Sequence, residues 1–455
     1  MGDKSASLAV VVLAAGKGTR MKSGVAKVLH PIAGRPMLSF PIAAAELLNP
    51  AQLIAVVGRD EARVREVFGA RATLVVQSEQ RGTGHAVLQT QQALLGFAGD
   101  VLILYGDTPL LRPETLAEMV AWKAETRADL VLLTAEVDVP GIVIRDDSGA
   151  VARIVEATDA TPEQLAIRER NTGVYLLGAE LLWKTLAQVG NRNEQGEIYL
   201  TDVVGLLVRD GLRIEALHLD DWEEAIGVNT RAELAAAAAV VRRRKCHELM
   251  MDGVTIVDPA ATYIDVGVEV GPDTVIEPGC SIQGDTRIGA GVHLKPGCLI
   301  ESSQVGDDVV IGPNAHLRPE SVLGRGVRIG NFVEIKNSVL GDGVKADHLS
   351  YIGDADVGAR ASIGCGAITV NYNWHDKNRT IIGEGANIGC NANLIAPVTI
   401  GRNAAVAAGS TVGAEVPEGA LAVERGRHRN IKDWVSKRKA RAGSSTRQAK
   451  DERKT

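Results

Sequence analysis

The C-terminal part of the chain repeats aliphatic residues at a spacing of six. Val, Ile or Leu stands at every sixth position over Ile264–Ile300, and after one-residue shifts over Val305–Ile335 and Ile382–Val412. This period fits neither an α-helix nor a strand that alternates at every second residue, which also argues against a β-sandwich. It is typical of short strands that wind into a prism with one inward aliphatic residue per face. We therefore predict a parallel β-helix that begins after Asp252 and runs to about Val416.

The N-terminal part alternates compact apolar runs with helical segments. This alternation predicts a doubly wound, mostly parallel α/β sheet that binds ligands at the carboxyl ends of its strands. Arg231–Met251 is rich in Ala, Arg and Glu without Gly or Pro, which predicts one long connecting helix. The predicted domains are residues 1–230, a helical linker 231–251 and residues 252–455. The predicted strands are Leu8–Ala14, Leu53–Val57, Thr73–Val76, Val101–Leu104 and Leu130–Ala135, and the predicted helices between them are Leu38–Leu48, Arg63–Phe68, Gly84–Gln92 and Pro113–Thr126.

Composition narrows the class of protein. Hydrophobic residues make up 45% of the 455 residues but aromatic residues only 3%, so the cores must consist of small aliphatic side chains. The five cysteines form no CxxC pair, which argues against a disulfide framework or a zinc cluster and favours the cytoplasm. The apolar run Leu8–Ala15 is too short to span a membrane.

The net charge of −6 is unevenly distributed. Arg425–Thr455 holds 12 Lys or Arg against 3 Asp or Glu, so the rest of the chain is acidic. A basic tail of this kind can hold an anionic ligand or nucleic acid, or it can be a solvated terminus. We favour the solvated terminus from Ser436 onward and expect neither a nucleic-acid nor a membrane partner.

A glycine-rich loop follows the first predicted strand. Ala15-Gly16-Lys17-Gly18-Thr19-Arg20 frees backbone N–H groups for phosphate oxygens, and Lys27 brings further positive charge. The spacing matches neither a P-loop nor a dinucleotide fingerprint. Another predicted strand ends at Tyr105-Gly106-Asp107, which places a carboxylate at the same sheet edge. Asp107 could simply cap a turn, but opposite a phosphate loop it is a candidate Mg²⁺ ligand.

The six-residue period is interrupted around His348. A histidine in a repeat protein is usually a packing or surface residue. Tyr351, Asn371, Tyr372 and the loop Asn373–Arg379 fall in the same interrupted stretch, and loops that break a regular scaffold often carry function. Because histidine titrates near neutrality, His348 is a candidate base for taking a proton from an attacking amine.

These motifs together resemble a known family. LAAGKGTRM at residues 13–21, Tyr105-Gly106-Asp107 and Asn171-Thr172-Gly173 resemble the sugar-nucleotide pyrophosphorylases, as do Lys27, Gln77, Gly82-Thr83, Glu156 and Asn229. Followed by a hexapeptide-repeat prism, the chain from residue 8 to about 434 resembles the bacterial bifunctional N-acetylglucosamine-1-phosphate uridyltransferases/glucosamine-1-phosphate acetyltransferases. The resemblance implies a Rossmann-like α/β nucleotidyltransferase domain and an all-β left-handed parallel β-helix. It also implies synthesis of UDP-N-acetylglucosamine for peptidoglycan and lipopolysaccharide precursors, in a cytoplasmic homotrimer.

For the uridylyl site, the resemblance implies binding of UTP, N-acetylglucosamine-1-phosphate and Mg²⁺. Arg20 and Lys27 would neutralise the triphosphate, and Asp107 and Asn229 would hold the metal ion. The family usually has Gly-Tyr-Gly-Arg where this chain reads Val139-Pro140-Gly141-Ile142-Val143, which leaves sugar selectivity open. The other implied nucleotide and sugar ligands are Leu13, Ala14, Ala15, Gly16, Gln77, Gly82, Thr83, Tyr105, Gly106, Gly141, Glu156 and Asn171.

For the acetyl site, the resemblance implies that His348 is the base and that acetyl-CoA and glucosamine-1-phosphate are the substrates. Ser362, Cys365 and Cys390 stand where the family has Asn, Ala and Ser, so we expect the pocket to survive with weaker hydrogen bonding at Cys390. The implied sugar-phosphate residues are Arg318, Lys336, Tyr351, Ser362 and Lys377, and the implied acetyl-CoA residues are Cys365, Asn371, Tyr372, Cys390, Ala408 and Arg425.

Three alternatives remain at this point. The chain could be a monofunctional nucleotidyltransferase whose prism only trimerises, although the interrupted stretch around His348 argues against this. It could be a non-enzymatic scaffold, which the joint presence of Lys27, Asp107 and Asn229 disfavours. The prism could bind zinc, but His293, His316 and His348 do not recur at a fixed hexapeptide spacing.

Overall fold

A computed structural model describes residues 7–58, 60–190, 196–424 and 426–440. The chain divides into two compact units. The N-terminal unit ends at Ile288 and also takes Ile300–Ser302, whereas the C-terminal unit holds Gly289–Leu299 and continues from Ser303. Among the described residues, none of the helices combines the length and the apolarity needed to cross a bilayer.

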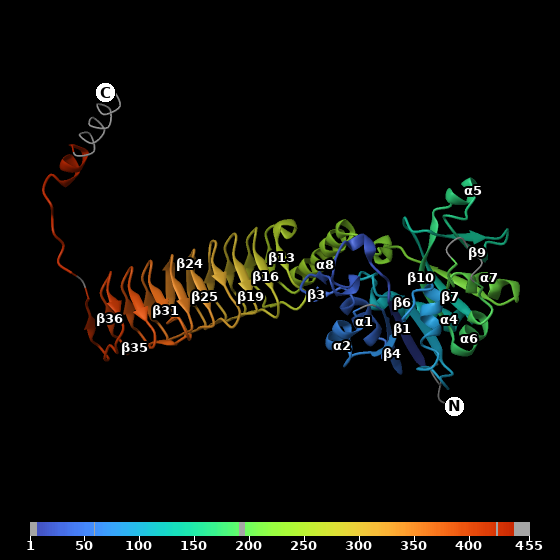
Figure 1. Ribbon diagram of the computed structural model, residues 1–455, viewed down its shortest axis with the longest axis horizontal. Helices are drawn as coiled ribbons and strands as arrows, with labels where there is room; N and C mark the ends of the chain where they lie inside the picture. Colours follow the sequence, from blue (N-terminus) through green and yellow to red (C-terminus); the bar gives the residue numbers. More distant parts are fainter. Residues whose placement is uncertain (1–6, 59, 191–195, 425, 441–455) are drawn as a thin grey trace, which may run out of the picture. The chain divides into compact units, whose positions relative to one another are not determined.

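The N-terminal unit is built on one mixed, mostly parallel sheet (Figure 1). Strand β10 is antiparallel to both of its neighbours, while the other strands along the main path pair in parallel. A hairpin of β8 (Gly141–Arg145) and β9 (Val151–Glu156) joins the edge of β10. The predicted strands and their mostly parallel arrangement are confirmed, but β8 to β11 were not predicted. The order is β11 (Ile214–His218), β7 (Leu130–Glu136), β10 (Glu169–Gly178), β6 (Asp100–Tyr105), β1 (Leu8–Ala14), β4 (Gln52–Val57) and β5 (Thr73–Val76).

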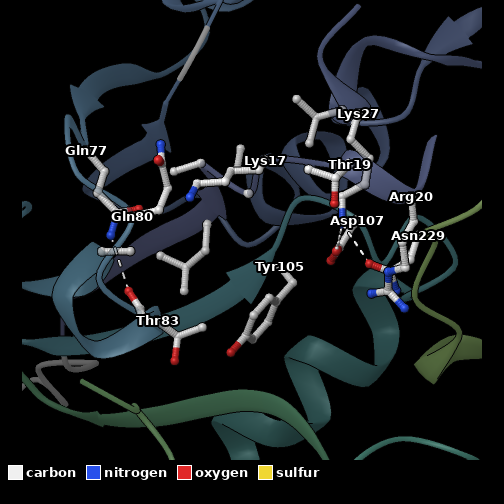
Figure 2. A pocket seen from close by; sticks show the side chains of 18 of the residues that line it. Lys17, Thr19, Arg20, Lys27, Gln77, Gln80, Thr83, Tyr105, Asp107 and Asn229 are labelled. Atoms are coloured by element: carbon white, nitrogen blue, oxygen red, sulfur yellow. Dashed lines mark hydrogen bonds and ion pairs between the residues drawn. The ribbon is translucent and has the colours of Figure 1, made fainter. Parts of the chain in front are cut away.

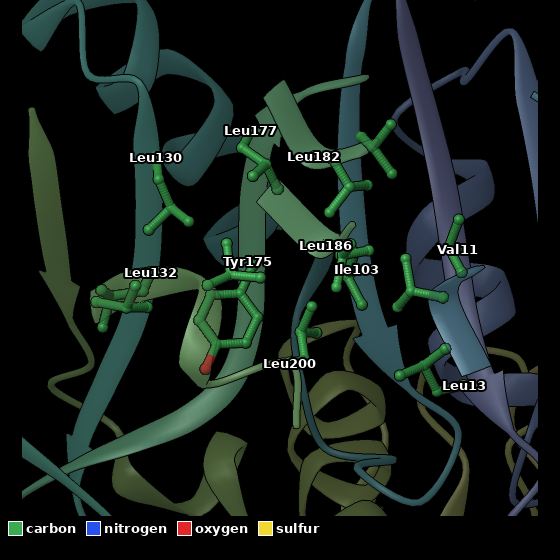
Figure 3. Packing of buried hydrophobic residues seen from close by; sticks show 14 of the residues in the cluster. Val11, Leu13, Ile103, Leu130, Leu132, Tyr175, Leu177, Leu182, Leu186 and Leu200 are labelled. Atoms are coloured by element: carbon green, nitrogen blue, oxygen red, sulfur yellow. The ribbon is translucent and has the colours of Figure 1, made fainter. Parts of the chain in front are cut away.

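Helices cover both faces of this sheet because its central strands are apolar on both sides. In β1, Val11 and Leu13 pack into one core, and Val10 and Val12 pack into the other. Figure 3 shows the first core around Tyr175, where side chains of several strands meet the flanking helices. The first core is covered by α3 (Thr83–Leu88), α6 (Ala179–Leu186) and α7 (Asp202–Arg209), and the second by α1 (Ser39–Glu46), α2 (Glu61–Phe68) and α4 (Pro113–Thr126).

The long helix α8 has the predicted bounds, Arg231–Met251. A capping box fixes its start, because Thr230 accepts from the Glu233 backbone N–H and the Glu233 side chain accepts from the Thr230 backbone N–H. The same Glu233 carboxylate accepts from the Asn229 backbone N–H at 2.6 Å. The cap therefore also fixes the residue that precedes it.

In the C-terminal unit, strands of two to four residues wind into coils with three faces, each a parallel sheet (Figure 1). The predicted inward residues are buried: Ile311, Leu317 and Leu323 stand on three successive faces and are at most 2% exposed. The first face consists of β18 (His293–Leu294), β21 (Val310–Ile311), β24 (Arg328–Asn331), β27 (Lys345–His348), β30 (Ser362–Ile363), β33 (Asn387–Ile388), β36 (Ala405–Val406) and β38 (Leu421–Ala422). The second face consists of β22 (His316–Leu317), β25 (Glu334–Lys336), β28 (Tyr351–Gly353), β31 (Ile368–Val370), β34 (Asn393–Ile395) and β37 (Thr411–Val412). The third face consists of β20 (Gln304–Val305), β23 (Val322–Leu323), β26 (Val339–Leu340), β29 (Ala355–Val357), β32 (Thr380–Ile382) and β35 (Val398–Ile400).

The same coil pattern occupies the end of the N-terminal unit. There β12 (Thr255–Ile256) pairs in parallel with β15 (Val275–Ile276), β13 (Tyr263–Ile264) with β16 (Ser281–Gln283), and β14 (Glu269–Val270) with β17 (Arg287–Ile288). The predicted parallel β-helix is confirmed.

Candidate functional site

The glycine-rich loop leaves β1 at the edge of the sheet where β6 also ends. Parallel pairing sets Leu13 beside Tyr105, so the loop and Asp107 emerge together. Gly18 has a left-handed backbone (φ 59°), and a Cβ there would lie 2.8 Å from the Lys27 Cβ. Only glycine lets the loop close over Lys27 in this way. A Cβ on Gly16 would meet no described atom within 4 Å, so this part of the loop faces open space.

The loop walls a cavity of about 760 Å³, a size typical of small-molecule sites. Figure 2 shows Gln77, Gln80 and Thr83 at one end of it and Arg20, Asp107 and Asn229 at the other. The described lining residues are Leu13, Ala14, Ala15, Gly16, Lys17, Gly18, Thr19, Arg20, Lys27, Val28, Gln77, Gln80, Gly82, Thr83, Ala86, Tyr105, Asp107, Glu197 and Asn229.

Lys27 joins three distant segments at the charged end of the cavity. Its ammonium group, on a side chain that is only 9% exposed, forms an ion pair with the Asp107 carboxylate and donates to Asn229 Oδ1 at 3.0 Å. The Asp107 backbone carbonyl accepts from the Val228 N–H at 2.8 Å. This hydrogen bond ties Asp107 to the backbone next to Asn229. A carboxylate and an amide oxygen thus converge on one positive charge.

The opposite end of the cavity holds a fixed carboxamide. Gln77 is 3% exposed, and its Nε2 donates to the Gly82 carbonyl at 3.2 Å and lies 3.0 Å from His85 Nδ1. Gly82 has φ 103°, and a Cβ there would lie 2.4 Å from the Ile198 carbonyl oxygen. Thr83 Oγ1 accepts from the Leu200 N–H at 3.1 Å. These contacts hold the Gln77 carboxamide and the Thr83 hydroxyl in one orientation, which suits hydrogen bonding to the edge of a planar base.

Tyr105 forms the floor between the two ends. Burial raises the pKa of its hydroxyl well above the ordinary value, and the Asp107 carboxylate raises it further. The hydroxyl therefore stays protonated and can donate a hydrogen bond. Gly173 (φ 84°) lies against the Tyr105 ring, since a Cβ on Gly173 would be 2.5 Å from it.

Four predicted residues are absent from the described lining of the cavity. Gly106 packs beneath the loop, where a Cβ would lie 3.1 Å from the Ala14 Cβ. Gly141 and Glu156 face each other across β8 and β9, and a Cβ on Gly141 would lie 3.3 Å from the Asn171 Cβ. Asn171 donates to the Tyr175 hydroxyl at 2.7 Å. The three predicted sugar-binding residues are thus brought together on the β8–β10 side of the sheet.

Glu156 is half-buried, and this burial raises the pKa of its carboxyl group. Thr201 donates to it at 3.4 Å and partly offsets the increase, whereas Asp202 and Asp159 add to it. An uncompensated carboxylate in such a place favours ligand groups that can donate hydrogen bonds, such as sugar hydroxyls.

Sequence reasoning missed four lining residues of the N-terminal cavity, Val28, Gln80, Ala86 and Glu197. Gln80 had a weak local signal, because it stands three residues after Gln77 in the same loop. Glu197 had none, since it approaches Gly82 from a segment more than a hundred residues away.

In the C-terminal unit, His348 ends strand β27 and is exposed. Its Nδ1 lies 3.0 Å from Asn331 Oδ1, on the neighbouring strand β24, where the two residues are in register. An amide oxygen can only accept, so the contact assigns the proton to Nδ1 and leaves Nε2 as the basic nitrogen. A cavity of about 260 Å³ lies beside it, lined by residues that include Lys295, Arg328 and Asp347. Asn331 was missed by sequence reasoning.

The predicted acetyl-CoA residues of the first face form a column along one edge of the coils. Cys365, Cys390 and Ala408 each stand two residues after a strand of this face, and these strands pair successively with one another and with β27, which ends at His348. The Asn391 N–H donates to the Cys365 carbonyl at 2.8 Å, which carries the column from one coil to the next. Cys365 is half-buried and Cys390 is exposed, so small side chains leave the edge open. Ser362 lies within β30, and Arg425 lies outside the described residues.

Of the predicted sugar-phosphate residues, Arg318, Lys336 and Lys377 gather near the carboxyl ends of second-face strands, whereas Ser362 stands on the first face. Arg318 follows β22 and pairs with Glu334 at 2.9 Å. Lys377 lies against Lys336 and lowers the pKa of the Lys336 amine, and Arg318 lowers it further. Like charges brought this close favour a bound anion. Arg318, Lys336 and Lys377 come from different coils and together form a cationic corner.

Asn371 links that charged corner to the histidine side of the coil. Its amide donates to the Asp354 carboxylate and, at 3.3 Å, to the Tyr351 hydroxyl. Tyr351 opens β28, the strand that follows the His348 turn, and its ring lies over Gly353 at the end of the same strand, since a Cβ on Gly353 would be 2.3 Å from the Tyr351 hydroxyl. Tyr372 forms an antiparallel bridge with Lys377 that closes the base of the inserted loop. Asp354 was missed by sequence reasoning.

The histidines considered for a zinc site stand on different strands: His293 on β18, His316 on β22 and His348 on β27. Within the described ranges, no group of three or more His, Cys, Asp or Glu side chains has a geometry that could hold a metal ion.

Both units contain segments that match known protein families. Residues 10–199 match the MobA-like NTP transferase domain, and residues 267–302, 302–337 and 379–414 match the bacterial transferase hexapeptide model of six repeats. The chain is 46% identical over 450 residues to the Bifunctional protein GlmU of Pelobacter propionicus, covering 94% of this chain and 98% of that relative. It is 47% identical to the same protein of Trichlorobacter lovleyi over 95% of this chain and 98% of the relative. The protein of Geobacter sulfurreducens is 45% identical, with 94% and 98% covered.

Proposed function

The chain belongs to the family of bifunctional GlmU proteins, and we propose that the cavity below the glycine-rich loop is its uridylyl site and the edge around His348 its acetyl site. The enzyme makes UDP-N-acetylglucosamine by acetylating glucosamine-1-phosphate and then transferring a uridylyl group from UTP to the product. Its C-terminal unit is a left-handed β-helix of hexapeptide repeats. The observation that carries the assignment of the uridylyl site is the meeting of Lys27, Asp107 and Asn229, and the contact between His348 and Asn331 supports that of the acetyl site.

At the uridylyl site, a phosphate oxygen of N-acetylglucosamine-1-phosphate attacks the α-phosphorus of UTP in line, and pyrophosphate leaves. The protein supplies no nucleophile, so its task is to align two anions that repel each other. Arg20 and Lys27 stand at the charged end for the phosphates, and Gln77 and Thr83 stand at the polar end for the uracil. Glu156 and Asn171 lie on the sugar side.

The residues at the charged end fit Mg²⁺. One carboxylate and one amide oxygen, from Asp107 and Asn229, are the hard oxygen donors that this ion prefers when phosphates complete its shell. Both oxygens already face a positive charge, the Lys27 ammonium. A bound ion would neutralise charge on the phosphates, while Glu233 keeps the Asn229 backbone in place.

At the acetyl site, His348 Nε2 takes a proton from the amino group of glucosamine-1-phosphate. The nitrogen then bonds to the thioester carbon of acetyl-CoA, the carbon–sulfur bond breaks, and the thiolate takes up the proton from His348 to leave as coenzyme A. Asn331 fixes the tautomer that makes Nε2 the base. A backbone N–H near Tyr372 would stabilise the oxyanion.

The sugar phosphate of the acetyl site binds to the cationic corner. Arg318, Lys336 and Lys377 repel one another when the corner is empty, as the lowered pKa of Lys336 indicates. A phosphate relieves this repulsion, so its binding is expected to raise the pKa of the Lys336 amine again. Tyr351 and Asn371 then orient the sugar toward the histidine.

A paired experiment tests the assignment of both sites. Asp107→Ala should abolish UTP-dependent pyrophosphate release and leave the release of free thiol from acetyl-CoA unchanged. His348→Ala should do the reverse. Loss of both reactions in either variant, with the fold intact by circular dichroism, would contradict the separation of the sites.

We also propose a homotrimer, the domains 1–230, 231–251 and 252–455, and a cytoplasmic location. Exposed aliphatic residues on the coils support assembly, since Ile368 and Ile395 are 41% and 45% exposed and stand on paired strands of the second face. The five cysteines are all free thiols, which suits a reducing compartment. Sedimentation should give three chains per particle.

A further inference from the structure

A second cavity of about 670 Å³ lies in the N-terminal unit. Its described lining shares no residue with that of the nucleotide cavity. It is formed by helix α1, the end of α2, strand β3 (Arg35–Pro36), the segment Pro109–Pro113 and one side of α8. Apart from Glu233 at the start of α8, which holds Asn229 in place and does not line this cavity, none of these elements supplies a residue to the reactions proposed above.

The floor of this second cavity is apolar. Phe40, Ala43, Phe68 and Leu111 contribute to it, and Leu47 stands at its rim with 68% of its surface exposed. Apolar side chains that face water in a concave site gain free energy when an apolar group covers them. The cavity is therefore suited to a ligand with a hydrocarbon or aromatic body.

The rim of the cavity is positively charged. It is lined by Arg35, Arg71, Arg112, Arg244 and Lys245, and Glu248 is the only carboxylate in the described lining.

The carboxylates that pair with the arginines stand behind the rim. Arg71 pairs with Glu46 at 2.7 Å and Arg112 with Asp221 at 2.5 Å, and neither carboxylate belongs to the described lining. These arginines therefore line the cavity without their carboxylate partners, and the one carboxylate of the described lining, Glu248, pairs with Lys245 at 2.8 Å.

Arg244 is the most confined of these cations. Its Nη1 donates to the Leu110 carbonyl at 2.6 Å, while its buried Nε has no partner among the described residues. Burial lowers the pKa of its guanidinium group, and the positive charge of Arg112 lowers it further. Asp221 pairs with both arginines and offsets part of these penalties, and an anion in the cavity would offset more of them.

We propose that this cavity binds a small amphipathic anion, a molecule with an apolar body and a single carboxylate or sulfonate group. The apolar body covers Phe40, Ala43 and Leu47, and the anionic group meets the guanidinium groups of the rim. The two features are adjacent in one cavity, so a ligand that has only one of them is expected to bind more weakly.

Isothermal titration calorimetry of the full-length enzyme with decanoate tests the proposal, with saturating UTP present to occupy the nucleotide cavity. We expect one site per chain and at least about tenfold weaker binding of decanol. Ala43→Trp fills the floor from the exposed side of α1 and should weaken binding at least about tenfold. Arg71→Gln removes one rim charge at an exposed position and should weaken binding about threefold.

Ala124→Trp is the matched control, because Ala124 is exposed on α4 and does not line the cavity. This variant should bind decanoate like the parent enzyme. The absence of saturable binding, equal binding of decanol and decanoate, or unchanged binding in both Ala43→Trp and Arg71→Gln would each overturn the proposal. Uridylyl transfer and circular dichroism of every variant should match the parent, which verifies folding.

Discussion

Removal of the Asp107 charge should both inactivate the uridylyl site and destabilise the N-terminal unit. The Lys27 side chain is 9% exposed and that of Asp107 is 22% exposed. Breaking a fully buried ion pair by removing one partner costs about 3–5 kcal/mol, because a charge is left without compensation. Here Asn229 Oδ1 remains 3.0 Å from the ammonium group, so Asp107→Asn should cost about 1–3 kcal/mol.

Differential scanning calorimetry can measure this cost. A unit of this size loses roughly 2–4 °C in Tm per kcal/mol, so Asp107→Asn should lower the Tm by roughly 2–12 °C. Adding Lys27→Met to Asp107→Asn removes the uncompensated charge and should recover about half of the loss. A double variant that is less stable than Asp107→Asn alone would refute the reasoning, because Lys27 would then stabilise the unit independently of Asp107.

A second ion pair provides a matched control for Asp107→Asn. Lys123 and Asp100 lie 2.9 Å apart, with side chains 17% and 20% exposed, outside the described lining of the nucleotide cavity. Asp100→Asn should therefore destabilise the unit to a similar extent but leave pyrophosphate release unchanged. Asp107→Asn should abolish pyrophosphate release, while acetyl transfer stays within about twofold of the parent in both variants.

Three further predictions follow from single contacts. Asn331→Ala removes the contact that fixes the tautomer of His348. It should lower kcat of acetyl transfer about tenfold and shift the pH profile of the reaction. An unchanged pH profile would contradict the role of Asn331. Burial raises the pKa of Glu156, so its ionised form destabilises the fold above that pKa. Glu156→Gln should therefore raise the Tm more at about pH 7 than at about pH 4. A larger increase at about pH 4 would contradict this reasoning. Gly82→Ala would place a Cβ 2.4 Å from a carbonyl oxygen and should cost at least about 2 kcal/mol in urea unfolding, whereas Gly16→Ala should cost less than about 0.5 kcal/mol and raise the KM for UTP.

The elements whose bounds were predicted most accurately are those that are determined by a local apolar run or a local helix cap. Strand β1 is buried on both faces and reads as an unbroken apolar run, so its bounds Leu8–Ala14 could be predicted to the residue. Helix α8 starts at the Thr230 capping box and contains no Gly or Pro. Strand β10 was not predicted, because its opening residues Glu169–Gly173 are polar or glycine and owe their strand to pairing with β7.

The side-chain partners of the sites depend on register, which sequence alone does not give. His348 meets Asn331 because β24 and β27 pair with an offset of 17 residues, one fewer than the six-residue period would give for a coil. Asn371 meets Asp354 across another such offset. Lys27, Asp107 and Asn229 could be singled out from their motifs, yet their meeting at one point requires three segments to fold together.

The stacking of the C-terminal coils restricts how this unit can evolve in length. Each strand hydrogen-bonds to the strand one coil later, so a short insertion within a face would turn buried aliphatic residues outward along everything that follows. Changes in length are therefore tolerated as whole coils, as single-residue changes between faces like those in the 17-residue coils, or as loops closed at their base, as the bridge between Tyr372 and Lys377 closes one here. Such a scaffold acquires new functional residues in loops inserted at its corners, while the spacing between its coils stays constant.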